Sequence, residues 1–161
     1  MHRVRQFVAH LTARVTPEEA AARTRVLPSD AVRLFEAMPV ADRRHALDVT
    51  ERLLAAGVDD RDVLAAALLH DAAKGHRMRL WHRIGGVLLQ AVAPAVLRRF
   101  ADPASASWRH GFHLYLHHPE LSADLATAAG VSARAADFIR GQAQDEDVQL
   151  LRALTAADDA S

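Results

Sequence analysis

Apolar side chains recur every three or four residues along most of the chain, which is the spacing that buries one face of an α-helix. No segment alternates between apolar and polar residues as a half-buried strand would, and no hairpin turn is evident. The sequence therefore predicts an all-α fold, organised as a single-domain helical bundle.

Capping residues and helix breakers divide this pattern into separate helices. Thr16 followed by Pro17 marks one start, and Ser132 caps another. Glycine or proline marks most of the ends. The predicted helices cover residues 2–14, a segment from 17, 29–38, 41–56, a segment from Asp59 or Asp60 to about Gly75, 79–100 with interruptions at Gly85-Gly86 and Pro94, 107–116, 119–129, 133–142 and 146–158.

We divide the bundle at residue 40. Residues 1–40 are predicted to form an N-terminal helical extension, and residues 41–161 the main helical domain. The chain shows no internal repeat and no second domain, as its length of 161 residues leads us to expect.

The stretch IGGVLLQAVAPAVLRRF, residues 84–100, is the one long apolar run. It is too short and too interrupted for a transmembrane helix, which needs about 20 apolar residues. We predict a buried helix of the bundle here. The alternative is an exposed apolar surface for a second copy or a membrane interface, with Arg98 and Arg99 at its rim.

Composition narrows the classes of function. The formal net charge is zero, whereas a nucleic-acid-binding domain is expected to be basic. The absence of cysteine excludes disulfides, thiolate metal sites and cysteine nucleophiles. Without a signal peptide or transmembrane segment, the expected location is cytoplasmic, with membrane-peripheral attachment through the basic residues 2–14 as an alternative.

The segment LLHDAAKG, residues 68–75, places His70 and Asp71 at the end of an apolar run. Two unpaired polar groups buried there would cost several kcal/mol. The chain's one lysine, Lys74, follows three residues later, against 19 arginines. His70 and Asp71, the HD doublet, are therefore a candidate functional site. The alternative is that they lie at a solvent-exposed helix C-terminus, where the helix dipole favours a protonated histidine.

His45 lies near the start of the predicted helix 41–56, and His70 near the end of the next helix. The short connection between these helices favours antiparallel packing, which would bring His45 beside His70 and Asp71. His118 and Asp158 also lie near helix ends that could meet there. Imidazole and carboxylate ligands suit Mn, Fe, Co, Ni, Zn or Mg, so we expect a divalent metal site.

These residues resemble a known family. The pattern of a histidine, 24 residues and then HD-x-x-K, followed far downstream by an aspartate in an Ala-Ala-Asp context, resembles the HD-domain metal-dependent phosphohydrolase superfamily. The resemblance covers roughly residues 40–159. It implies a divalent metal held in a helical bundle by His45, His70, Asp71 and Asp158, with Asp159 as the alternative to the last of these.

The resemblance also implies an activity. Such an enzyme hydrolyses a phosphomonoester or phosphodiester, with a nucleotide as the expected substrate, through a metal-activated water. Asp71 would orient that water as well as bind the metal. Lys74 would neutralise phosphate charge, and His118 would donate a proton to the leaving oxygen or bind a second ion.

The segment LHHPELSADLA, residues 116–126, is similar to a segment of the HD-GYP-type cyclic-dinucleotide phosphodiesterases, in which the histidine before proline assists a second metal. In that branch the returning helix ends in Ile-x-x-His-His, whereas this chain reads Ile139-Arg140-Gly141-Gln142 and lacks the GYP signature. We therefore assign no cyclic-dinucleotide specificity.

The alternative function is a non-catalytic HD-type module that binds a metal or nucleotide and regulates a partner. The lack of histidine at residues 141 and 142 favours it. The sequence also leaves a homodimer open. A stripe formed by His110, His113 and His117 is either plain surface or a second metal site.

Overall fold

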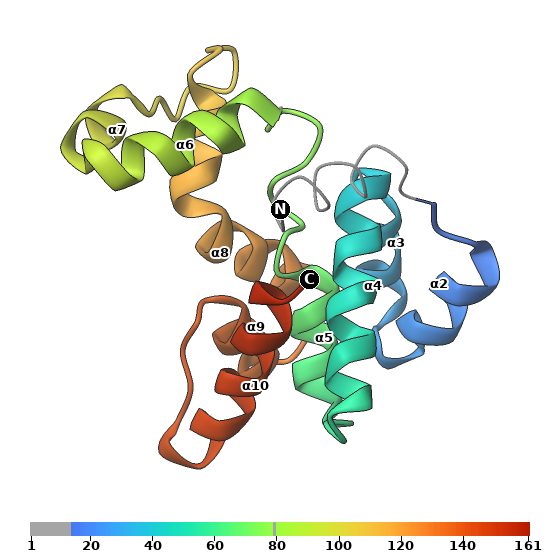
Figure 1. The fold of residues 1–161 in the computed structure, drawn as a ribbon. Coiled ribbons are helices and arrows are strands. Elements are labelled where there is room, and N and C mark those ends of the chain that lie inside the picture. The colour runs from blue at the N-terminus through green and yellow to red at the C-terminus, as the bar shows by residue number, and fades with distance from the viewer. Residues whose placement is uncertain (1–13, 79) are drawn as a thin grey trace.

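The computed structural model describes residues 14–78 and 80–161 (Figure 1). Within these residues the chain forms an all-α single domain of nine packed helices and contains no β-strand, which confirms the predicted fold class. The predicted helix over residues 2–14 falls outside the described part of the chain, apart from its last residue.

The boundaries agree with the capping residues. The side chains of Thr16, Asp60 and Ser132 each accept a hydrogen bond from the first turn of a helix, as their sequence context predicts. The helices are α2 (Pro17–Arg23), α3 (Ser29–Glu36), α4 (Val40–Ala55), α5 (Arg61–Leu69), α6 (Leu80–Val92), α7 (Pro94–Phe100), α8 (His110–Ala128), α9 (Ala133–Ile139) and α10 (Val148–Asp159), with 3-10 turns at Thr24–Val26 and Asp145–Asp147.

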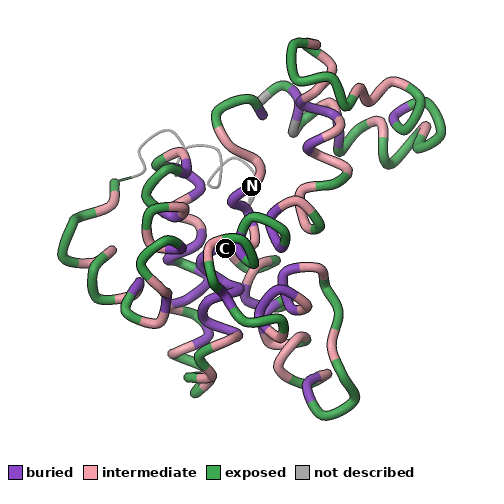
Figure 2. Tube along the Cα trace, turned by 180° about the vertical axis from the view of Figure 1, so that it is seen from behind, coloured by how far each residue is buried: buried purple, intermediate pink, exposed green. Residues whose placement is uncertain are grey.

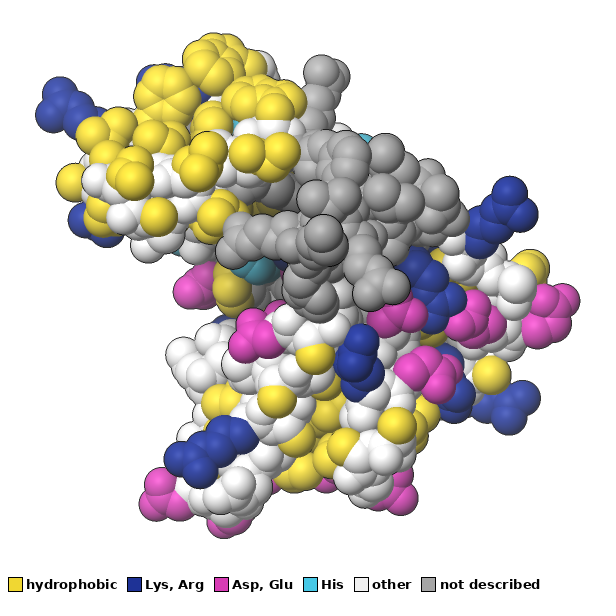
Figure 3. All heavy atoms as spheres, viewed as in Figure 1, with side chains coloured by type: hydrophobic (Ala, Val, Ile, Leu, Met, Phe, Trp, Pro, Cys, Tyr) yellow, Lys and Arg dark blue, Asp and Glu magenta, His cyan; other side chains and the backbone are white. Residues whose placement is uncertain are grey.

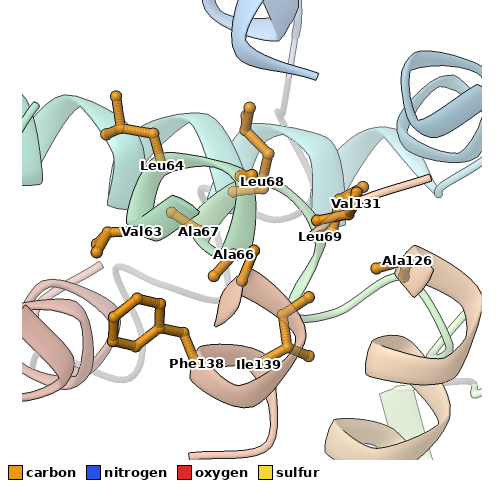
Figure 4. Packing of buried hydrophobic residues seen from close by; sticks show 14 of the residues in the cluster. Val63, Leu64, Ala66, Ala67, Leu68, Leu69, Ala126, Val131, Phe138 and Ile139 are labelled. Carbon is orange, nitrogen blue, oxygen red and sulfur yellow. The ribbon is translucent and has the colours of Figure 1, made fainter. Parts of the chain in front are cut away.

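Helix α5 is the centre of the core. Every residue from Val63 to Leu69 is buried. Helices α4, α9 and α10 pack against it, and the buried positions gather in this part of the molecule (Figure 2). Phe138 and Ile139 of α9 lie against α5 in the close view (Figure 4). Helices α4 and α5 run antiparallel, as predicted (Figure 1).

Helix α3 belongs to the same core. Ala31 and Phe35 are fully buried and lie in one cluster with residues of α4 and α5. The predicted extension over residues 1–40 therefore contributes, through α3, to the packing of the main helical domain.

The prediction that the fifth helix continues to about Gly75 is wrong, because α5 ends at Leu69. Beyond it the chain turns more tightly than an α-helix. The amide of Ala72 donates to the Leu69 carbonyl, and the amide of Lys74 donates to the Asp71 carbonyl, both three residues back. The HD doublet therefore lies in a series of turns after the helix.

The predicted break before Pro119 is also wrong, since α8 is continuous from His110 to Ala128. Proline has no amide hydrogen, so Pro119 leaves the carbonyl of Tyr115 without its helical donor. The Nδ1 of His118 takes that place and donates to the Tyr115 carbonyl over 3.0 Å. His118 consequently lies in the middle of a helix and not at the start of one.

Helices α6 and α7, with the loop to α8 and the first turn of α8 (residues 80–112), form an arm that projects from the rest of the molecule (Figures 1 and 2). The predicted interruption at Pro94 is confirmed, but Gly85 and Gly86 lie inside α6. A Cβ atom at Gly86 would lie 2.6 Å from the Tyr115 ring, so this glycine permits close packing of α6 on α8.

The prediction that residues 84–100 form a buried helix is wrong. Ile84, Leu88 and Val92 are 52%, 60% and 79% exposed, whereas Leu97 is buried. Periodicity alone could not separate the two alternatives, because both present an apolar helix face. Among the described residues, none of the helices has the length and hydrophobicity needed to cross a bilayer.

We expect Leu68→Ala to lower the free energy of unfolding by about 2–5 kcal/mol, because it removes buried methyl groups and leaves a cavity. The matched control is Leu125→Ala at a 43% exposed position, which should change stability by less than about 0.5 kcal/mol. Urea unfolding followed by circular dichroism measures both. Equal losses in the two variants would contradict the central position of α5.

Candidate metal centre

Three segments far apart in sequence meet at one end of the core. His45 lies in α4, His70 directly follows α5, and Asp158 lies near the end of α10. The rings of His45 and His70 have centroids 5.3 Å apart. The Nε2 of His45 lies 2.8 Å from Oδ1 of Asp158. One ligand atom from each of the three residues lies within 4.8 Å of the other two.

The packing of α10 brings Asp158 to this position. Leu154 and Ala157 are buried on the face of α10 that meets the core, and α10 contacts both α4 and α5. Asp158 is half-buried beside the two histidines, whereas Asp159 is exposed. Of the two aspartates left open by the sequence, Asp158 is the one that lies at the candidate centre.

The ring of His70 is oriented by the end of its own helix. Its Nδ1 donates to the Ala67 carbonyl over 2.9 Å, in the last turn of α5 where carbonyls lack helical donors. The Nε2 atom therefore faces Asp158, with Oδ1 3.5 Å away. Such a bond from the second ring nitrogen is how proteins orient histidine ligands of metals.

Asp71 also lies beside His70 and is almost fully buried. Its Oδ1 lies 3.6 Å from Nε2 of His70 and 3.8 Å from Nε2 of His118. The Nζ of Lys74 donates a hydrogen bond of 2.6 Å to its Oδ2. Asp71 therefore links the candidate centre to the charge of Lys74, and it lies outside the group of three residues that gather most closely.

Charges within the cluster shift the pKa values of its members. Burial would raise the pKa of Asp71, but the neighbouring His70 and Lys74 hold it below its ordinary value. Burial also opposes ionisation of Asp158, yet His45 and His70 keep its pKa low. Both carboxyl groups are therefore anionic near neutral pH.

His70 responds in the opposite direction. Burial lowers the pKa of the His70 imidazole, but the carboxylates of Asp71 and Asp158 more than offset this, so its pKa lies above the ordinary value. The carboxylates of Asp71 and Asp158 both face this ring, and together they favour its protonated, cationic form in the metal-free protein.

The residues present fit a divalent cation. With metal–ligand bonds of about 2.1 Å, neighbouring ligand atoms lie about 3.0–3.4 Å apart, close to the 2.8 and 3.5 Å separations from Asp158 to the two histidines. In addition, Nε2 of His70 is buried and has no hydrogen-bond partner among the described residues. Coordination to a metal ion would satisfy this nitrogen.

A pocket of about 170 Å³ lies next to the centre and is lined by His70, His118 and Asp158 on its polar side. The sequence did not predict it, because its apolar wall is assembled from three helices. That wall consists of Pro119 of α8, Phe138 and Ile139 of α9, and Leu151 and Leu154 of α10.

Ser122 was also missed by the sequence prediction. It is fully buried, and its Oγ accepts a hydrogen bond of 3.0 Å from the amide of Ala73. This contact ties the turns that carry the HD doublet to α8. The sequence feature that could have identified Ser122 is its spacing of four residues from His118, which places both side chains on one face of α8.

The histidine stripe on α8 does not belong to the group of mutually close ligand atoms found among the described residues. The rings of His110 and His113 stack with centroids 5.7 Å apart, and those of His113 and His117 lie 4.6 Å apart. Among the described residues, the group with mutually close ligand atoms is that of His45, His70 and Asp158.

Comparisons of the chain with models of known families, with curated proteins and with solved structures find no match. The resemblance to the HD-domain superfamily therefore depends on the motif residues themselves.

We expect His70→Ala and Asp158→Ala each to weaken binding of Mn or Zn by at least about a hundredfold, since even indirect partners of metal ligands contribute tenfold to a hundredfold. Isothermal titration with metal-free protein measures this. His117→Ala is the matched control, because His117 is exposed on α8 and outside the group. Equal weakening in the control would count against the site.

We expect the pKa of His70 in metal-free protein to lie above its ordinary value of about 6.5 and to fall in Asp71→Asn, which removes the charge that raises it most. A raised folded-state pKa means that the charged ring stabilises the fold below the unfolded pKa. This contribution disappears as pH rises through the folded-state pKa. Imidazole proton shifts in an NMR titration test this, and an unchanged pKa in Asp71→Asn would contradict it.

Proposed function

We propose that this protein is a metal-dependent phosphohydrolase of the HD type, which acts on a phosphomonoester or phosphodiester. The observation that carries the proposal is the convergence of His45, His70 and Asp158 beside the buried Asp71 and its partner Lys74. A cation site next to a fixed carboxylate and an ammonium group suits hydrolysis of a phosphate ester.

In this proposal His45, His70 and Asp158 hold a divalent ion, with Asp71 as a further ligand. The ion would supply a Lewis acid for the phosphate and lower the pKa of a water. The orientation of His70 by the Ala67 carbonyl supports its role as a ligand through Nε2.

Asp71 and Lys74 have complementary tasks. The lowered pKa of Asp71 keeps its carboxylate anionic, so it accepts a hydrogen bond from the attacking water and orients it. Lys74 holds this carboxylate through Oδ2 and, as a partly exposed point charge, is available to a phosphate oxygen.

The pocket limits the part of the substrate that can be enclosed. Its volume of about 170 Å³ is below the roughly 300–1,000 Å³ typical of small-molecule sites. A phosphate group with a small substituent fits such a space. In a nucleotide substrate, therefore, the phosphate would enter the pocket and the base would lie outside it.

The alternative is a non-catalytic module that binds metal or a nucleotide, and one observation favours it. Helix α9 ends at Ile139, and Arg140, Gly141 and Gln142 after it include no histidine that could hold a second ion, although Gly141 lines the pocket. This favours one ion over two. Turnover of a phosphate ester by metal-loaded protein separates the enzyme from the module.

We expect protein loaded with Mn, Co or Ni to hydrolyse p-nitrophenyl phosphate, its diester or a nucleotide, and His70→Ala to reduce kcat/KM by at least about a hundredfold. Lys74→Ala should raise KM, because it removes a charge that binds phosphate. Hydrolysis is measured by release of nitrophenol or phosphate, with His117→Ala as the control.

Two outcomes argue against this function. Tight metal binding that His70→Ala abolishes, without turnover of any substrate, would support the non-catalytic module. If wild-type protein binds neither metal nor a nucleotide and hydrolyses nothing, both versions of the proposal are wrong.

A further inference from the structure

Charge is distributed unevenly along this formally neutral chain. Residues 72–119, which include the whole arm, contain seven Lys or Arg and a single acidic residue, Asp102. The rest of the chain contains 13 Lys or Arg and 19 Asp or Glu. The region of the arm is therefore strongly basic and the remainder acidic.

The one acidic side chain in this region is neutralised locally. Asp102 Oδ2 accepts a hydrogen bond of 3.1 Å from Arg109, and its Oδ1 accepts one from the amide of Ala104. Arg98 and Arg99 are exposed at the end of α7. The arm therefore presents a surplus of positive charge to its surroundings.

The same arm carries most of the large exposed apolar side chains among the described residues. They gather over α6 and α7 as a broad patch (Figure 3). We call these residues the arm patch, and they are between 41% and 79% exposed: Trp81, Ile84, Val87, Leu88, Val92, Val96 and Trp108.

The aromatic part of the arm patch is held in place from within. The ring of Trp81 stacks on His82 with centroids 3.6 Å apart, and it lies 5.9 Å from Trp108. Nε2 of His82 donates to the Trp108 carbonyl over 2.9 Å. Both tryptophans thus contact other residues of the arm and are still exposed, at 44% and 63%.

We propose that the arm patch docks on an anionic lipid surface. Tryptophan favours the boundary between headgroups and acyl chains, and exposed aliphatic side chains on a helix face insert there. Arginines at the rim add attraction to anionic lipids, about 1 kcal/mol each near the surface. The arm combines all three features on α6, α7 and the loop before α8.

The charge distribution favours a membrane over a second copy of the chain as the partner. Contact between two arms would bring two strongly basic regions together, which is unfavourable. On an anionic membrane the basic arm is attracted and the acidic remainder is repelled, so the molecule would be oriented with the arm toward the lipid. This attachment does not depend on the proposed phosphohydrolase activity.

The experiment uses intrinsic fluorescence, since the protein's two tryptophans both belong to the arm patch. Vesicles of phosphatidylcholine with phosphatidylglycerol should shift the emission to the blue and cosediment with the protein, while pure phosphatidylcholine vesicles should bind much more weakly. The double variant Arg98→Glu/Arg99→Glu should weaken binding by at least about 30-fold, from about 1 kcal/mol for each arginine.

A second double variant, Leu88→Glu/Val92→Glu, tests the contribution of apolar side chains to membrane binding. Both positions are exposed, so the substitutions do not place charge in the core. It should abolish the fluorescence shift, whereas the matched control Leu125→Glu, an exposed leucine of α8 outside the arm, should bind as wild type does. Circular dichroism verifies that each variant is folded.

Three outcomes overturn the proposal: no binding to phosphatidylglycerol vesicles, equal binding to both vesicle types, or equal loss in Leu125→Glu. Sedimentation velocity without lipid tests the alternative partner, a second copy of the chain. A wild-type dimer that Leu88→Glu/Val92→Glu converts to a monomer would assign the arm patch to contact between copies of the chain.

Discussion

The structure depends on the complete burial of α5. A helix with apolar residues on every side cannot rest on one neighbour, so α4, α9 and α10 must surround it, with α3 and α8 closing the remaining sides. The polar residues that follow this helix are then drawn into the interior with it. The cluster around His70 is a consequence of that burial, since the imidazole of His70 is carried to within 3.6 Å of Asp71 and 3.5 Å of Asp158, where their charges compensate part of the cost of burial.

The sequence predicted those features of the fold that depend on interactions between residues close together in the chain. Thr16, Asp60 and Ser132 cap helices because their side chains bond to amides two or three residues away. Predictions failed where a distant partner decides the outcome. Gly86 lies inside a helix, where its lack of a side chain lets Tyr115 pack closely, and the arm is exposed because no helix of the described residues covers it.

The candidate site follows the same division. The antiparallel pairing of α4 and α5 could be predicted from their short connection, and it brings His45 beside His70. The approach of Asp158 depends on how α10 crosses these helices, which periodicity does not encode. It was predicted from a resemblance in the motif. The pocket and the role of Ser122 required the packing of three helices and were not predicted.

Pro119 has a consequence for the chemistry of its neighbour. Because His118 lends its Nδ1 proton to the carbonyl that the proline leaves free, the neutral ring carries a lone pair on Nε2, the atom that faces Asp71. Burial and the charge of Lys74 lower the pKa of His118 and keep it in this form. In this tautomer the lone pair on Nε2 can take up a proton or coordinate a cation. One missing amide hydrogen thereby orients the ring of His118 and exposes Nε2 to the cluster.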